Sequence, residues 1–277
     1  MGLIARDDGW RVPDVLWLEL EPLLPRHEAE HPLGCHRRRV PDRSAMNAIL
    51  FVLRTGCQWN ALNATGICSS SSAHRRFLEW TEHGVFEKAW VRALDVYDEF
   101  VGVDWQWLSM DGAMSKAPLG GEKTGPNPTD RAKGGSKRSL LTEANGIPVG
   151  LAVAGANVND FKLLRETVES IPVPRPKPTR QNPQNLCLDK GYDYQEPREL
   201  VAAFKFTAHI KSRGEEAKAI KRRAGFRARR WVVERTHSWM NRFRRVLVRW
   251  EKRADTYLAM LHLALALITW RASGLLG

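Results

Sequence analysis

Residues 135–160 read GSKRSLLTEANGIPVGLAVAGANVND. Two apolar runs flank Asn145 and Gly146, a dipeptide that favours the tight turn of a β-hairpin. The stretch therefore predicts two antiparallel strands that fold back on each other, followed by a short helix over residues 160–171.

The sequence on both sides of this hairpin alternates between strand-like and helical segments. Residues 103–111 resemble a strand, and residues 172–184 form a proline-rich, basic surface connection. Beyond it, the patterns predict a strand, a helix, a strand and a long helix, at residues 185–188, 195–204, 205–210 and 227–250. This order indicates an α/β domain with a mixed sheet.

The first hundred residues are predicted to be mostly helical. Helices are expected over residues 13–25, over residues 42–55 with Asp42 or Ser44 as the cap and an end at Gly56, and over residues 73–100 with a break near Gly84. Short helices joined by Gly/Ser turns, one of them opened by Arg75 and Arg76, fit a helix-turn-helix-like unit that contacts DNA. A plain helical bundle with solvated arginines is the alternative.

Composition narrows the class of protein. The chain has 277 residues, 43% of them hydrophobic, and a net charge of +12, which favours a polyanionic partner, although a basic protein without one also fits. Its four scattered cysteines form no CxxC pair. The apolar residues 257–270 are fewer than the roughly 20 that span a bilayer and contain His262. We therefore expect a buried helix there, no membrane association, and a cytoplasmic, nucleoid-associated protein.

Two expected strands end in an aspartate. Asp111 closes WLSMD and Asp189 closes NLCLD, so both carboxylates are predicted to meet at one edge of the sheet. Oxygen ligands of this kind suit Mg²⁺, and two ions about 3.5–4 Å apart can assist attack on a phosphodiester. A single aspartate at a strand end is more often a turn former. Asp193 is a rival to Asp189, and we expect it to cap the helix that follows instead.

A third acid, Glu234, stands inside the basic segment RARRWVVERTHSWMNRFRRVLVRW, residues 227–250. It is either a further metal ligand or a solvated acid that relieves repulsion among arginines, and spacing leaves both readings open. Trp231 and Trp239 are expected in the core. The glycine-rich residues 121–139 form a second basic stretch suited to holding a DNA strand. The candidate DNA-binding residues are Arg75, Arg76, Lys133, Lys137, Arg230, Arg235, Asn241, Arg242 and Arg245.

Three stretches together carry a family resemblance: DGAMSKAPLGGEKTGPNPTDRAKGGSKRSLL at 111–141, LDKGYD at 188–193 and RWVVERTHSWMNRFRR at 230–245. With the helical front part they resemble the transposases of the IS5 family of bacterial insertion sequences, over about residues 10–270. The resemblance implies an RNase H-like catalytic domain at 101–277, a mixed sheet flanked by helices, preceded by a small all-helical DNA-binding domain at 1–100. It further implies a DDE triad of Asp111, Asp189 and Glu234 that holds two Mg²⁺ ions, with Mn²⁺ as a possible substitute.

Two positions depart from the family pattern. Asn241 stands where a lysine is sometimes found seven residues after the glutamate, and Arg227 replaces the usual tyrosine seven residues before it, whereas Arg230 matches a family arginine. The resemblance implies a DNA transposase that cuts and transfers strands at terminal inverted repeats, acts on double-stranded DNA and assembles at least as a homodimer. A non-catalytic repressor derived from a transposase and another RNase H-like nuclease are the alternatives.

Overall fold

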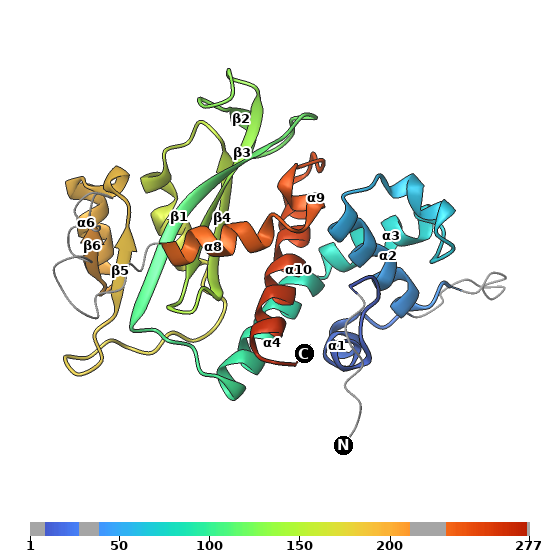
Figure 1. Cartoon of the computed structure of the whole chain (residues 1–277), viewed down its shortest axis with the longest axis horizontal. Helices are drawn as coiled ribbons and strands as arrows, with labels where there is room; N and C mark the ends of the chain where they lie inside the picture. The colour runs from blue at the N-terminus through green and yellow to red at the C-terminus, as the bar shows by residue number, and fades with distance from the viewer. Residues whose placement is uncertain (1–8, 28–38, 211–230, 276–277) are drawn as a thin grey trace.

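A six-stranded mixed sheet is the centre of the computed structural model, which describes residues 9–27, 39–210 and 231–275 (Figure 1). Its strands are β1 (Trp107–Lys116), β2 (Gly125–Pro126), β3 (Gly134–Thr142), β4 (Pro148–Gly155), β5 (Asn185–Leu188) and β6 (Thr207–Ile210). β3 lies between β1 and β4, and β5 and β6 follow on the other side of β1. Helices flank this sheet and a helical part precedes it, which confirms the predicted mixed α/β class.

The hairpin predicted from Asn145 and Gly146 is present. β3 and β4 pair antiparallel, and the Gly146 N–H donates to the Glu143 carbonyl oxygen over 2.9 Å. Gly146 has a φ of +88°, a left-handed conformation that glycine adopts without steric cost. The other edge of β3 pairs antiparallel with β1, where Asp111 faces Leu140.

The opposite half of the sheet is parallel. β1 pairs with β5 only from Trp107 to Ser109, which faces Cys187, and β5 pairs with β6 along its length. The prediction that the first strand ends at Asp111 is wrong, because β1 continues to Lys116. Its ladder with β3 continues to the end of the strand, so β1 stays extended after β5 has left it.

Four helices precede the sheet: α1 (Asp14–Leu20), α2 (Asp42–Thr55), α3 (Ser70–Glu82) and α4 (Val85–Phe100), with the 3₁₀ turns η1 (Glu21–Leu23) and η2 (Trp59–Ala64). Gly56 ends α2 and Gly84 separates α3 from α4, both left-handed, as the sequence predicts. The capping prediction for α2 is wrong: Pro41 occupies the N-cap position, so Asp42 already lies within the helix.

The described residues of the second part of the chain contain the helical elements η3 (Asp160–Leu163), α5 (Leu164–Glu169), η4 (Lys190–Tyr192), α6 (Gln195–Ala203), α8 (Trp231–Met240), α9 (Arg244–Leu247) and α10 (Ala254–Ala272). The single long helix expected up to residue 250 is wrong, because α8 ends at Met240 and Phe243 is extended before α9. After α9 the Arg249 N–H donates to the Lys116 carbonyl oxygen over 2.8 Å, which draws the backbone onto β1.

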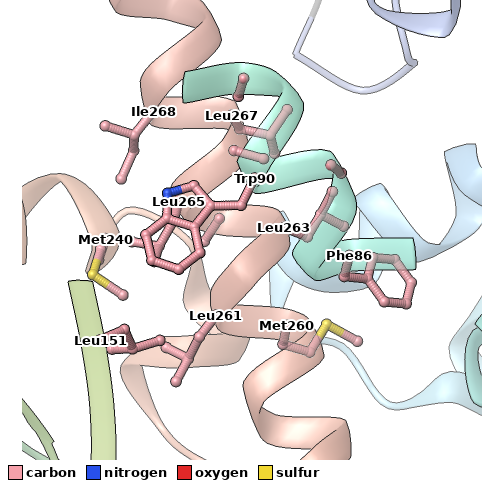
Figure 2. Packing of buried hydrophobic residues seen from close by; sticks show 14 of the residues in the cluster. Phe86, Trp90, Leu151, Met240, Met260, Leu261, Leu263, Leu265, Leu267 and Ile268 are labelled. Atoms are coloured by element: carbon pink, nitrogen blue, oxygen red, sulfur yellow. The ribbon is translucent and has the colours of Figure 1, made fainter. Parts of the chain in front are cut away.

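The C-terminal helix α10 lies against α4, and Figure 2 shows Trp90 of α4 facing Leu263, Leu265 and Leu267 of α10. The Trp90 indole N–H donates to the Pro148 carbonyl oxygen over 3.1 Å, so this contact also reaches β4. The predicted buried helix is confirmed. Among the described residues, no helix combines the length and apolar character that crossing a membrane requires.

Candidate functional site

Asp111 and Asp189 reach the same level on neighbouring strands. β5 pairs with β1 up to Ser109 and Cys187, and continuing that register by two residues sets Asp111 beside Asp189. Adjacent strands lie about 4.7–4.9 Å apart, and aligned residues share a face. Asp189 is the first residue after β5, and its Oδ1 accepts a hydrogen bond from the Gly191 N–H over 2.8 Å. The two carboxylates therefore occupy the point where β5 separates from β1.

The charge environment of Asp111 shows which acids surround it. Burial raises the pKa of Asp111 to about 6, a hydrogen bond from the Gly112 N–H lowers it, and the negative charges of Asp189, Asp160 and Glu234 raise it further. These acids come from four separate segments of the chain. Mutual repulsion of this kind marks a place where a positive partner would stabilise the folded protein.

Asp160 is a member of this acid group that sequence reasoning missed. It is the first residue of η3, and its Oδ1 lies 2.0 Å from where a Cβ on Gly112 would stand, so only glycine leaves room for it. Lys137, a candidate DNA-binding residue, is buried and pairs with Asp160 over 3.1 Å. In the sequence, the residues NVND at 157–160 close the predicted hairpin stretch, and Asp160 was interpreted only as the first residue of the short helix; its position directly after the hairpin was the available signal.

Tyr192 is a second residue that the sequence did not single out. Its side chain is fully buried, and within the described part of the chain its hydroxyl has no hydrogen-bond partner. Burial raises the pKa of Tyr192 well above its usual value, and the negative charges of Asp160, Asp111 and Asp189 add to the rise. The hydroxyl therefore stands within electrostatic reach of three of the four acids.

Helix α8 brings Glu234 to the group from the far end of the sequence. Glu234 is exposed in the first turn of α8, and His237 on the buried side fastens this helix to β1. The His237 Nε2–H donates to the Asp111 carbonyl oxygen over 3.3 Å. Burial and then the charge of Arg138 lower the pKa of His237 to about 3, so the ring is neutral at pH 7 and donates from this nitrogen.

The hairpin turn holds the other side of α8. The Thr236 hydroxyl donates to the Gly146 carbonyl oxygen over 2.6 Å, and Arg235 donates to the Asn145 carbonyl oxygen. These bonds link two segments about 90 residues apart in sequence. The hairpin that decides the sheet therefore also sets the position of the helix that carries Glu234.

Asp193 is not among the acids whose charges raise the pKa of Asp111. Its carboxylate is exposed and binds Arg198 over 2.6 Å. The prediction that Asp193 caps the following helix is wrong, because Tyr194 occupies the N-cap position of α6. Asp193 instead follows η4 and pairs with a residue one turn into α6.

No closed cage of metal ligands is present in the described ranges. Among these residues, no three His, Cys, Asp or Glu side chains form a group with the geometry of a metal site. The four acids around Asp111 nevertheless supply only oxygen donors, the type that hard divalent cations prefer. The donor chemistry at this edge fits such a cation, and the carboxylates are open to further ligands from water or a substrate.

The candidate DNA-binding residues fall into two groups. Arg75, Lys133 and Arg242 are exposed. The others described have protein partners: Arg76 is buried against Asp42 and Glu79, Arg245 pairs with buried Glu251 over 2.6 Å, and Asn241 accepts a bond from Arg138. This geometry gives Arg76 and Arg245 structural contacts and lends no support to a DNA contact. Arg230 lies outside the described residues.

Arg235 lies between two indole rings. Its guanidinium carbon is 4.6 Å from the centroid of Trp231 and 4.7 Å from that of Trp239. The expected burial of Trp231 is wrong, since 49% of its surface is exposed, and Trp239 is half-buried. Both rings lie on the outer side of α8 because Val232, Val233 and Thr236 occupy the side that faces the sheet.

Two family models match the chain. Residues 12–90 match a family described as a putative transposase of the IS4/5 family, and residues 103–269 match the transposase DDE domain. The second match covers more than half of the chain.

Relatives with curated sequences come from the same insertion element of Burkholderia cepacia. A putative transposase for insertion sequence element IS402 is 42% identical over 157 residues, which are 54% of this chain and 70% of that protein. An uncharacterized 16.2 kDa protein of IS402 is 31% identical over 118 residues, 42% of this chain and 80% of that protein. Among solved structures, a piggyBac transposase in a synaptic complex with hairpin DNA is 11% identical. The match covers 96% of this chain and 73% of the piggyBac chain, at a TM-score of 0.46.

Proposed function

Because the chain belongs to the family of transposases with a DDE domain, we propose that it cuts DNA at the ends of an insertion sequence and joins these ends to a target duplex. Enzymes of this family cleave and transfer DNA strands with divalent metal ions. The single observation that supports the proposal for this chain is the group of four acids around Asp111, at the point where β5 leaves β1.

Asp111, Asp189 and Glu234 are the proposed metal ligands, for two Mg²⁺ ions that Mn²⁺ can replace. Bound metal would supply charge stabilisation for the phosphodiester and a lower pKa for the attacking water. Mg²⁺ commonly binds one or two protein carboxylates and completes its shell with water and substrate phosphates. Such binding is compatible with the absence of a three-residue cage among the described residues.

The remaining residues of the site keep the acids in place. The ladder from β1 to β3 fixes the Asp111 backbone, and the His237 bond to the Asp111 carbonyl fixes α8 relative to it. Lys137 offsets the charge of Asp160, the acid outside the proposed triad. These contacts preorganise the acids before DNA binds, which lowers the cost of orientation during the reaction.

The proposed reaction has two displacement steps at phosphorus. In the first, a water oxygen attacks the phosphodiester at the element's end, the P–O3′ bond breaks, and a 3′-hydroxyl and a 5′-phosphate are released. In the second, that 3′-hydroxyl attacks a target phosphodiester, a new P–O bond forms, and the target's own 3′-oxygen leaves with a proton. Both steps proceed in line and need no covalent bond to the protein.

DNA binding is assigned to the two parts of the chain in different ways. We propose that residues 1–100 recognise the terminal repeats through exposed side chains such as Arg75, and that residues 101–277 hold DNA at the acids with Lys133 and Arg242. Arginine and lysine bind phosphate oxygens irrespective of base sequence. Joining two ends requires at least a dimer on DNA, and association with the nucleoid is the matching proposal for localisation.

The test uses the full chain and a duplex made from the DNA that flanks its coding sequence. Asp111→Asn, Asp189→Asn and Glu234→Gln are each expected to reduce Mg²⁺-dependent strand cleavage by more than about a thousandfold. Binding of the same duplex in EDTA is expected to change less than threefold, because the acids are not the source of affinity.

Asp193→Asn is the matched control, since it removes a nearby carboxylate that pairs with Arg198. It should retain cleavage within about threefold of the unaltered chain. Full cleavage by any of the three acid variants would contradict the assignment of that residue. Binding without any cleavage in the unaltered chain would favour a non-catalytic DNA-binding protein instead.

A further inference from the structure

A cavity of about 590 Å³ lies where residues 9–10, α2, the turn after α8 and α10 meet. Its lining contains three arginines, Arg54, Arg242 and Arg271, and two tryptophans, Trp10 and Trp239. Within the described part of the chain, no Asp or Glu lines it. The catalytic proposal leaves this cavity unused, although Arg242 is one of the candidate DNA-binding residues.

The lining has the chemistry of a site for a ligand that combines a phosphate group with a planar aromatic ring. Arg242 and Arg271 are exposed at its edge, and arginine binds phosphate oxygens through paired N–H groups. Trp10 exposes 52% of its surface, and a tryptophan face stacks on any nucleobase. Cavities of 300–1,000 Å³ are typical of small-ligand sites, so the volume suits a single nucleotide.

Helix α8 connects this cavity to the acid group. Trp239 lines the cavity and stacks on Arg235, and Arg235 stacks in turn on Trp231, which lies at the same end of the helix as Glu234. From Glu234 to Trp239 the helix rises about 7.5 Å, or about two steps of a DNA strand at 3.4 Å each. Figure 1 shows α8 running from β1 toward α10, the helix that carries Arg271.

We propose that this cavity binds one unstacked nucleotide of the DNA strand that passes the acid group. Arg242 and Arg271 take the phosphate, and the indole of Trp10 or Trp239 takes the base. The stacked side chains of Trp231, Arg235 and Trp239 lie beside the DNA strand, between the acid group and the cavity. The inference rests on the proposed function and adds a subsite where the strand leaves its duplex.

The first experiment locates the bound base. The full chain in EDTA is irradiated with a single-stranded decanucleotide that contains one 5-iodouracil, and cross-linked peptides are identified by mass spectrometry. We expect cross-links at Trp10 or Trp239, since these rings line the cavity. Cross-links confined to aromatic residues outside the cavity would overturn the proposal.

The second experiment measures affinity for the same decanucleotide as salt is varied. Arg242→Gln and Arg271→Gln are each expected to reduce the slope of log affinity against log salt by about 0.7, the loss of one single-strand phosphate contact. Trp10→Leu should weaken binding about tenfold through lost stacking. Arg165→Gln removes an equal charge from α5, outside the cavity lining, and serves as the control. Equal slopes in all three arginine variants would overturn the phosphate assignment.

Failure of this inference is distinguishable from failure of the proposed function. The binding measurements contain no metal and no cleavage, so the outcome of the Asp111→Asn cleavage assay does not affect them. If the cavity is empty of DNA while cleavage depends on the acids, the proposed function stands and the subsite is rejected. Circular dichroism of each variant confirms that lost binding is not lost folding.

Discussion

Two carboxyl groups in this protein, buried Glu143 and half-buried Asp111, have similar pKa shifts and different surroundings. Burial raises the pKa of Glu143 to about 7 and that of Asp111 to about 6. Glu143 accepts hydrogen bonds from the backbone N–H groups of Asp104, Asn145 and Ile147, over 3.3, 2.7 and 2.9 Å. Asp111 accepts one such bond, and the negative charges of three other acids raise its pKa.

The difference separates an acid whose partners lie inside the protein from one that we propose to bind metal. Glu143 lies in the hairpin turn, and its bonds tie that turn to Asp104, in the segment before β1. Its polar groups are all matched inside the protein, so nothing further is needed there. Burial and the charges of three other acids destabilise the charged form of Asp111, and a bound cation would relieve that repulsion. The partners of a buried acid, and not the size of its pKa shift, indicate its role.

The largest expected effect that sharpens this comparison is the pH dependence of stability. The pKa of Glu143 rises from 4.5 in the unfolded chain to about 7 in the folded protein, so the unfolded chain releases this proton first as pH rises. The contribution of Glu143 to the free energy of unfolding should therefore be highest below pH 4.5 and fall by up to about 3 kcal/mol by pH 7. Chemical denaturation of the unaltered chain and of Glu143→Gln, at intervals of half a pH unit, measures it.

The difference in free energy of unfolding between the unaltered chain and Glu143→Gln separates the effect of Glu143 from that of other titratable groups. Burial lowers the pKa values of His237 and His262 to about 3 and about 4, and these two contribute stability that is lost as pH falls, in the opposite direction. Subtracting the two curves removes that shared contribution. A difference that stays constant from pH 4.5 to pH 7 would contradict the raised pKa of Glu143.

A smaller effect is expected for Glu143→Gln at a fixed pH of 7. The amide keeps one acceptor oxygen and adds an NH₂ group that faces backbone donors, so at least one buried N–H loses its partner. We expect a loss of about 1–3 kcal/mol in the free energy of unfolding. Glu169→Gln, at an exposed residue paired with Arg165, should change it by less than about 0.5 kcal/mol.

Equal stability of Glu143→Gln and Glu169→Gln would show that the hydrogen bonds to the Glu143 carboxylate make no net contribution to the free energy of unfolding. Catalytic rate per folded molecule should be similar in both variants. A selective loss of cleavage in Glu143→Gln without loss of stability would move Glu143 from the structural to the functional group.

The smallest change in the free energy of unfolding is expected for Asp111→Asn, and this change is a gain in stability. Asp111→Asn removes one negative charge from the group of four acids, so the free energy of unfolding at pH 7 should rise by about 1 kcal/mol while cleavage is lost. Added Mg²⁺ should stabilise the unaltered chain and have less effect on the variant. Thermal unfolding with and without 5 mM Mg²⁺ measures both, and a destabilised Asp111→Asn would contradict the repulsion inferred here.

Much of the fold was readable because its signals are local. The Asn145–Gly146 turn, the left-handed glycines at 56 and 84 and the apolar residues of α10 each fix a short segment through its own backbone or burial preferences. The predictions that failed depend on other segments. β1 extends past Asp111 because β3 pairs with it, and the helix that begins with α8 breaks because the backbone after α9 bonds to Lys116.

The candidate site shows the same division. Two aspartates at neighbouring strand positions were predicted from apolar runs followed by acids, whereas Glu234 was assigned to the site only through the family resemblance, because its isolation among arginines left two readings open. Asp160 and Tyr192 were missed, because nothing in the spacing of residues 157–160 or 190–194 reveals that they face Asp111. Arg76 and Arg245 were assigned to DNA because charge alone does not show whether a guanidinium is paired inside the protein.

The sequence by itself determined the family of this protein, the order of its strands and helices and the types of residue available for chemistry, since these depend on residues close together in the chain. The tertiary structure alone decided which acids lie within electrostatic reach of Asp111, which arginines are buried and where a cavity opens beside Trp239. The physical reason is distance along the chain: the register of β5 on β1 sets Asp189 beside Asp111, and the His237 bond to the Asp111 carbonyl oxygen docks α8, which carries Glu234. Those depend on burial and hydrogen bonds between segments that no local pattern specifies.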